Sequence, residues 1–217
     1  PQTEYKMLEA ARELAKSEPL EIVASFLGAH TLPAEARGSQ ADRERYVDLV
    51  CEEMIPEVTK GDLAEMCDVF LDRGVFDRDQ ASRILGTAKD AGLKPRMHAG
   101  QFTDLGGPEV AAEVGALSAD HMEQFSDEGI RAMAEAGVIA CLLPGAALSL
   151  GMHFPDGKRL RDAGVEVALA TDCNPGTSRS ENLPLMVTLA ATAMGITIED
   201  ALRGITITAA RALGIED

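Results

Sequence analysis

Residues 93–143 read LKPRMHAGQFTDLGGPEVAAEVGALSADHMEQFSDEGIRAMAEAGVIACLL and decide the fold class. Short apolar runs alternate there with patterns typical of helices. The predicted strands are 93–98, 116–121 and 138–143, and the predicted helices are 107–115 and 126–136. The helices end at Gly115 and Gly137, where a helix terminus favours a left-handed residue. Alternation without hairpin signals predicts a parallel sheet with helical crossovers.

The same alternation continues on both sides of this segment. Further strands are expected at 22–27, 68–71 and 165–171, and further helices at 4–17, 40–60, 77–91, 156–163, 180–194 and 197–212. The glycine-rich residues 145–157 are predicted to form a loop. Two α/β architectures fit, a doubly wound open sheet and a (β/α) barrel, although a barrel needs about eight strands. Without a Pro-, Gly- or Ser-rich linker, residues 1–217 are predicted to form a single domain.

The composition excludes several classes of function. The 217 residues carry 20 basic and 36 acidic side chains, a net charge of -16, which repels nucleic-acid phosphates. No apolar run approaches the roughly 20 residues of a membrane-spanning helix, and the first residues do not resemble a signal peptide. The four cysteines are far apart, which favours a reducing cytoplasm over a disulfide framework.

Polar side chains follow four of the predicted strands at their carboxyl ends. These residues are His30, His98, His121 and Asp172. This edge carries the active site both in barrels and in open parallel sheets. Imidazole and carboxylate groups are the usual ligands of catalytic zinc. His98, His121 and Asp172 together therefore predict a metal site or an acid–base site.

Each of these residues also has a purely structural interpretation. A histidine at a strand end is often a hydrogen-bonded core residue, and Asp172 can form a turn before Asn174. The amide groups of the loop 174–178 are able to bind an anion. The chain contains neither a nucleotide-binding glycine fingerprint nor a GxSxG nucleophile motif.

Five motifs resemble the imidazolonepropionase family of the amidohydrolase superfamily. They are FLGAH at 26–30, MHAGQ at 97–101, SADHME at 118–123, LLPGA at 142–146 and ALATDCNPGTS at 168–178. The resemblance extends from the helix at Glu4 to Gly214, and the last motif is the most specific.

The resemblance implies a TIM-like (β/α) barrel of the metal-dependent hydrolase type, with about six of its eight units present. It implies hydrolysis of the cyclic amide of 4-imidazolone-5-propanoate to N-formimidoyl-L-glutamate, in histidine degradation. His98 and Asp172 match ligands of one metal, zinc or iron. Asp172 also matches the group that accepts a proton from water, and His121 matches the group that polarises the carbonyl or assists proton transfer. The matching substrate-binding residues are His30, Gln101, Asn174, Gly176 and Thr177.

Two departures from the family pattern qualify this expectation. The HxH metal ligands of the first barrel strand, the second strand and the small β domain are absent from residues 1–217, so the six strands correspond to strands three to eight. Gln101 stands where some relatives have Glu, and an amide cannot act as a base. The alternatives are a truncated non-catalytic remnant or scaffold, or another amidohydrolase such as a nucleobase deaminase. The expected partners are a small anionic substrate and a second copy in a homodimer, with neither nucleic acid nor membrane.

Overall fold

Six strands form a single sheet in the order β1-β2-β3-β4-β5-β6 in the computed structural model, which describes residues 1–215. The strands are β1 Ser25–Ala29, β2 Met66–Leu71, β3 Lys94–Ala99, β4 Ser118–His121, β5 Ile139–Leu142 and β6 Val167–Leu169. Strand β1 pairs in parallel with β2, β4 with β5, and β5 with β6. Sequential parallel strands separated by helices confirm the predicted α/β class.

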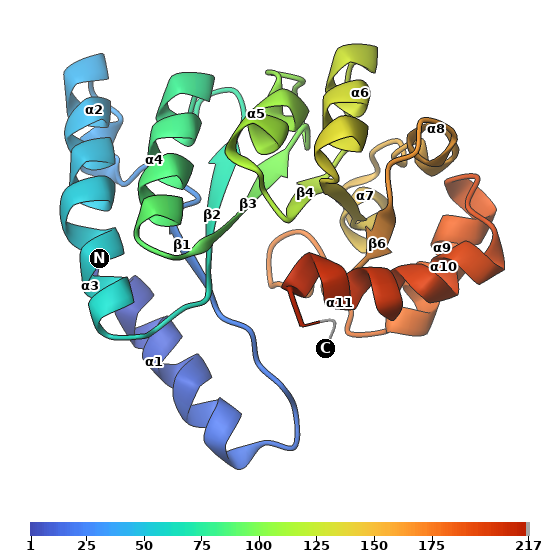
Figure 1. The fold of residues 1–217 in the computed structure, drawn as a ribbon, viewed down its shortest axis with the longest axis horizontal. Helices are drawn as coiled ribbons and strands as arrows, with labels where there is room; N and C mark the ends of the chain where they lie inside the picture. The colour runs from blue at the N-terminus through green and yellow to red at the C-terminus, as the bar shows by residue number, and fades with distance from the viewer. Residues whose placement is uncertain (216–217) are drawn as a thin grey trace. The chain divides into compact units, whose positions relative to one another are not determined.

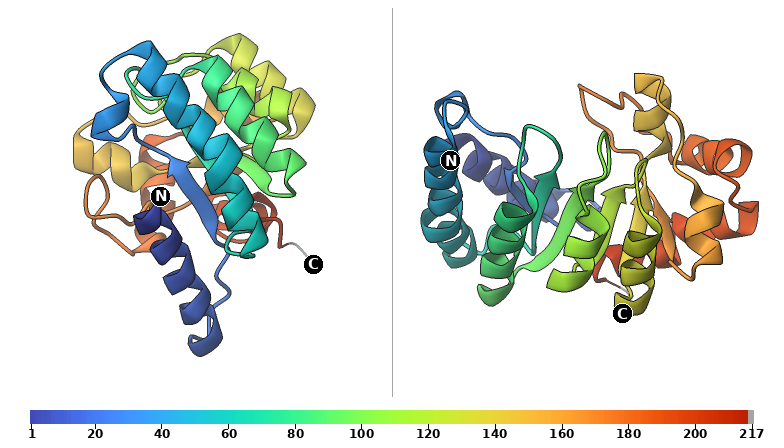
Figure 2. Two further views of the ribbon diagram at one scale, coloured as in Figure 1. Left: turned by 90° about the vertical axis from the view of Figure 1, so that its left-hand side faces the viewer. Right: turned by 90° about the horizontal axis from the view of Figure 1, so that it is seen from above.

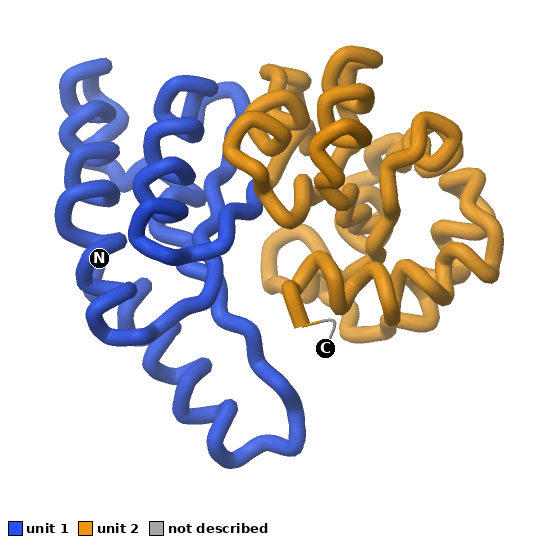
Figure 3. Tube along the Cα trace, in the orientation of Figure 1, with its two compact units in different colours: residues 1–97 blue, residues 98–217 orange. Residues whose placement is uncertain are grey.

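The chain divides into two compact units, Pro1–Met97 and His98–Asp217 (Figure 3). The division falls within β3, between Met97 and His98. None of the described helices is long and apolar enough to cross a membrane.

The first unit places helices around β1, which is partly buried, and β2, which is wholly buried. Its helical segments are α1 Gln2–Ser17, η1 Ala34–Ala36, α2 Gln40–Leu49, η2 Val50–Met54, α3 Ile55–Lys60 and α4 Arg78–Asp90. All six residues of β2 are buried, as expected for a parallel strand covered on both faces. Helix α4 begins at a reciprocal cap, in which Asp77 and Gln80 each satisfy the other's backbone N–H. The side chain of Glu4 accepts the N–H of Leu27 at 2.7 Å and so ties α1 to β1.

The second unit repeats the strand–helix pattern. Its helices are α5 Gly107–Val114, α6 Asp127–Ala136, α7 Pro144–Leu150, α8 Gly157–Asp162, α9 Leu183–Ala193, α10 Ile198–Gly204 and α11 Ile207–Leu213. Helices α5 and α6 pack against each other (Figures 1 and 2). Both end at a left-handed glycine, Gly115 and Gly137, as predicted. A core beneath β5 and β6 includes Cys141, Ala168 and Ala212.

The structure corrects two predictions of local structure and confirms a third. The predicted loop at 145–157 contains α7, because Pro144 occupies a first helical turn, where its missing N–H costs nothing. Gly145 suits this helix for its size, since a Cβ there would lie 2.6 Å from Oγ of Ser178. The helix predicted at 197–212 is interrupted around Thr206, between α10 and α11. The helix predicted at 40–60 is confirmed, and its middle part is the π-helical segment η2.

Candidate active site

The predicted site residues lie at or just beyond the carboxyl ends of their strands. His98 is the penultimate residue of β3, and His121 is the last residue of β4. Asp172 follows β6 by three residues, within the second unit that also contains both histidines. His30 directly follows β1 in the first unit. These placements agree with the sequence, whereas the chemical roles of the residues stay predictions.

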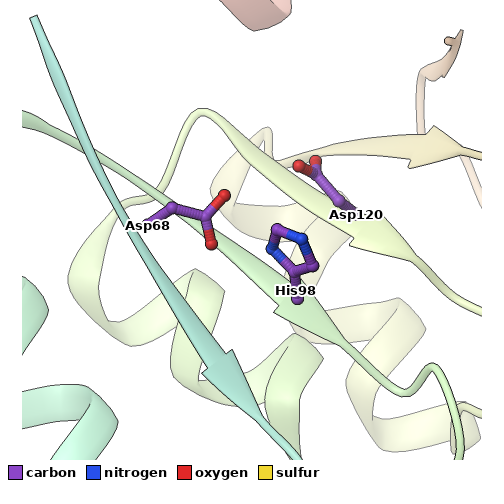
Figure 4. Close-up of side chains that lie close together, drawn as sticks. All are labelled: Asp68, His98 and Asp120. Carbon is purple, nitrogen blue, oxygen red and sulfur yellow. The ribbon is translucent and has the colours of Figure 1, made fainter. Parts of the chain in front are cut away.

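His98 lies beside two polar residues of β4. The ring centroids of His98 and His121 are 5.1 Å apart, with the ring planes inclined by 48°. A ring nitrogen of His98 and a carboxylate oxygen of Asp120 lie within 4.8 Å of each other (Figure 4). Asp120 is 4% exposed and accepts a hydrogen bond of 2.7 Å from Oγ of Ser118. Imidazole and carboxylate groups therefore meet in a protected part of the second unit.

The loop after β6 is organised around the side chain of Asn174. Its Oδ1 accepts the N–H groups of Gly176 at 2.8 Å and of Thr177 at 2.7 Å. Its Nδ2 donates to the carbonyl oxygen of Asp172 at 2.7 Å. Asn174, rather than Asp172, thus forms the turn considered from the sequence. The two amide groups expected to bind an anion are occupied by Asn174 in this structure.

Asp172 combines partial burial with an unusual backbone. Its φ of +51° is in the left-handed region, which is uncommon outside glycine and occurs at functional sites. Burial raises the pKa of Asp172, whereas nearby His98 and hydrogen bonds from Thr177 and Asn174 oppose that rise. Oγ of Thr177 donates to Oδ2 of Asp172 at 3.2 Å. A carboxylate adjusted in this way by its neighbours is suited to exchanging a proton.

Two predicted substrate-binding residues lie apart from this loop in the sequence. The ring of His30 stacks on Phe70 in the first unit, with centroids 5.3 Å apart. Gln101 directly follows the left-handed Gly100 in the second unit and is 5% exposed.

Three buried acidic residues at or near these strands were not predicted from the sequence. Asp120 is described above, and Asp68, also labelled in Figure 4, lies on β2 of the first unit with Arg96 Nε 3.5 Å from its carboxylate. Glu123 follows β4 and is 5% exposed. Burial raises the pKa of Glu123 to about 8, and the charge of Asp172 adds to this effect. The sequence signal that was available for them is an acidic residue within a buried strand or directly after it.

The fold is shared with solved structures of amidohydrolases and related enzymes. An adenosine deaminase from Xanthomonas campestris with bound zinc matches 97% of this chain and 52% of its own, with a TM-score of 0.64 and 20% identity. A mutant atrazine chlorohydrolase from Arthrobacter aurescens TC1, complexed with zinc and atraton, matches 95% and 52%, with a TM-score of 0.68 and 17% identity. An amidohydrolase matches 79% and 47%, with a TM-score of 0.59 and 18% identity. The chain therefore has an amidohydrolase-type α/β fold.

Curated relatives are much more similar in sequence. Imidazolonepropionase from Geobacillus kaustophilus is 53% identical over 211 residues, which are 97% of this chain and 49% of the relative. Imidazolonepropionase from Porphyromonas gingivalis is 43% identical over 216 residues, which are 100% and 50%. No protein-family model matches the chain. The chain spans about half the length of the curated relatives it matches, and over that half it is a homologue of imidazolonepropionases.

Proposed function

We propose that the protein to which this chain belongs is a hydrolase that opens the ring of 4-imidazolone-5-propanoate to give N-formimidoyl-L-glutamate. The observation that carries the proposal is 53% identity to an imidazolonepropionase across 97% of the chain. The juxtaposition of His98 and His121 and the unusual environment of Asp172 support it. Because the chain spans about half of its relatives, the activity is proposed for the complete protein.

The donor groups of the second unit suit a metal ion. His98 offers a ring nitrogen and Asp172 a carboxylate, and the proximity of the two is reflected in the influence of His98 on the pKa of Asp172. Both groups are common ligands of zinc and of iron. We propose that they would hold one such ion together with ligands from outside this chain. When bound, the ion would supply Lewis acidity to the hydrolysis.

The remaining roles follow from the chemistry of ring opening. Water adds to the ring carbonyl carbon, and we propose that the carboxylate of Asp172 accepts the proton that the water loses. The carbon–nitrogen bond then breaks, and the ring nitrogen that leaves takes up a proton. We propose that His121, which is 2% exposed and lies beside His98, stabilises the carbonyl oxygen or moves this proton. Gln101 can contribute hydrogen bonds but no base.

The substrate is an anion, and its carboxylate needs hydrogen-bond donors. We propose that the loop of Asn174, Gly176 and Thr177 binds it, with His30 as a further donor. In this structure the amides of Gly176 and Thr177 donate to Asn174 Oδ1. Substrate binding through these amides therefore requires the side chain of Asn174 to move, whereas binding through Asn174 Nδ2 requires it to turn from Asp172.

A direct assay of the complete protein tests the proposed function. The full-length gene product is incubated with 4-imidazolone-5-propanoate, and N-formimidoyl-L-glutamate is quantified by mass spectrometry beside an Asp172→Ala variant. We expect product from the wild-type protein and a loss of about 1000-fold or more in the variant. Ammonia released from a nucleobase without ring opening would instead identify a deaminase. Lack of activity together with lack of bound metal in the full-length protein would identify a non-catalytic remnant.

A further inference from the structure

Glu123 is a buried carboxyl group whose oxygens are both without a hydrogen bond. Oε1 and Oε2 are inaccessible and have no partner of acceptable geometry. Most buried polar groups in proteins are hydrogen-bonded, and leaving one unsatisfied costs about 1–3 kcal/mol. Burial raises the pKa of Glu123 to about 8, although the residue's own backbone N–H lowers it. This unfavourable burial occurs next to the candidate active site.

An imidazole nitrogen of His121 lies close to this carboxyl group. Oε2 of Glu123 lies 3.9 Å from Nδ1 of His121, and the two side chains are 1% and 2% exposed. This separation exceeds a hydrogen bond by less than about 1 Å, which a small side-chain rotation closes. The negative charge of Asp172 acts on the same carboxyl group and disfavours its ionised form. Of these two neighbours, Asp172 repels an ionised Glu123, whereas the imidazole of His121 can form a hydrogen bond with it.

Three backbone contacts hold the segment that carries both residues. The N–H of Met122 donates to the carbonyl oxygen of Ala99 at 3.1 Å, and the N–H of Gln124 donates to that of Gly100 at 2.8 Å. Nε2 of His153 lies 2.9 Å from the carbonyl oxygen of Glu123. His121 and Met122 have φ values of +80° and +60°, a strained conformation that these contacts maintain. Glu123 and His121 are thus held in a defined mutual position.

We propose that Glu123 is a positioning residue, whose carboxyl group holds Nδ1 of His121 and so fixes Nε2 as the imidazole nitrogen that acts on the substrate. A carboxyl group that fixes the tautomer and orientation of a histidine has this effect in catalytic triads. The inference rests on the proposed function for the role of His121, but the contact itself is a property of this chain. Its expected consequence is a single preferred tautomer of His121.

The contact is tested first by nitrogen spectroscopy on the 217-residue chain with 15N-labelled histidine. The His121 signals are identified as those missing from a His121→Asn spectrum. Wild-type His121 should carry its proton on Nδ1 once the Glu123 carboxyl group is ionised, above its pKa of about 8, because a carboxylate only accepts hydrogen bonds. Glu123→Met, which keeps the length of the side chain, should abolish that preference. Glu109→Met is the matched control, because Glu109 also has a buried oxygen without a partner but lies on α5. Identical His121 nitrogen shifts in the wild type and Glu123→Met would overturn the proposal.

The role in the reaction is tested in the full-length enzyme. Glu123→Met should lower kcat by about tenfold or more while changing KM by less than about threefold, because only proton transfer is affected. Glu123→Gln should recover part of kcat, since its amide oxygen still accepts from Nδ1–H. An unchanged kcat in Glu123→Met would refute the role. A wild-type enzyme without activity would refute the proposed function instead, and the nitrogen spectra would still decide whether Glu123 positions His121.

Discussion

Gly100 allows β3 and the segment after β4 to approach each other, so its replacement should be unusually costly. A Cβ built on Gly100 lies 2.0 Å from the carbonyl oxygen of Gln124, whereas such contacts need about 3.3 Å. The backbone would have to separate by more than about 1 Å, which breaks the 2.8 Å hydrogen bond from Gln124 N–H to Gly100 O. The loss of that bond costs about 1–3 kcal/mol. Alanine at a φ of +63° adds about 1–2 kcal/mol.

Gly100→Ala should therefore destabilise the second unit by about 2–5 kcal/mol. Gly137→Ala is the matched control, since Gly137 has a similar φ of +72° but its added Cβ meets no atom within 4 Å. The control should lose only about 1–2 kcal/mol. Urea unfolding followed by circular dichroism measures both changes, and hydrogen exchange of the Met122 and Gln124 amides locates the effect. Equal losses in the two variants would refute the steric argument.

Three further predictions concern the candidate site and its surroundings. Asn174→Ala removes the Nδ2 donor proposed to bind the substrate carboxylate, so in the full-length enzyme KM for the imidazolone should rise by about tenfold; an unchanged KM would exclude Asn174 Nδ2 from substrate binding. Burial raises the pKa of Glu123 from 4.5 to about 8, so the folded chain keeps a proton that the unfolded chain releases between these values. The free energy of unfolding should then fall with rising pH, by up to about 1.4 kcal/mol per pH unit, and urea titrations of Glu123→Gln should lack this part of the pH dependence. Equal slopes of unfolding free energy against pH in the wild type and Glu123→Gln would contradict the raised pKa. Arg159 pairs with Asp127 and lies 4.9 Å from the ring centroid of Phe125, so Arg159→Ala should cost about 0.5–1 kcal/mol, less in high salt; a salt-independent loss would point to packing.

Residues 93–143 illustrate how much of the fold follows from local sequence. Buried strands leave continuous apolar runs, and helices end at glycines such as Gly115 and Gly137 because a left-handed residue there strains any side chain with a Cβ. The element α7 was missed because glycine at 145 weakens the helical pattern. Only the close approach of Ser178, distant in sequence, explains why glycine stands there.

In the candidate site, too, some features follow from the sequence alone and others do not. His98, His121 and Asp172 were predictable from sequence because parallel strands bring their carboxyl ends to one edge, whichever way the chain packs in detail. Their proposed metal and substrate came from the motif resemblance, since residue types alone left an acid–base site equally open.

The sequence by itself determined the order of strands and helices, the edge at which the candidate site lies and the family that the motifs resemble, because these depend on periodicity and on residues near one another in the chain. Only the tertiary structure decided the environment of each group. It showed that the amides of Gly176 and Thr177 donate to the side chain of Asn174. It also showed that the carboxyl group of Glu123 is buried without a hydrogen bond near Nδ1 of His121. Burial and hydrogen bonding arise from residues distant in sequence, and these surroundings set the pKa and orientation of a side chain.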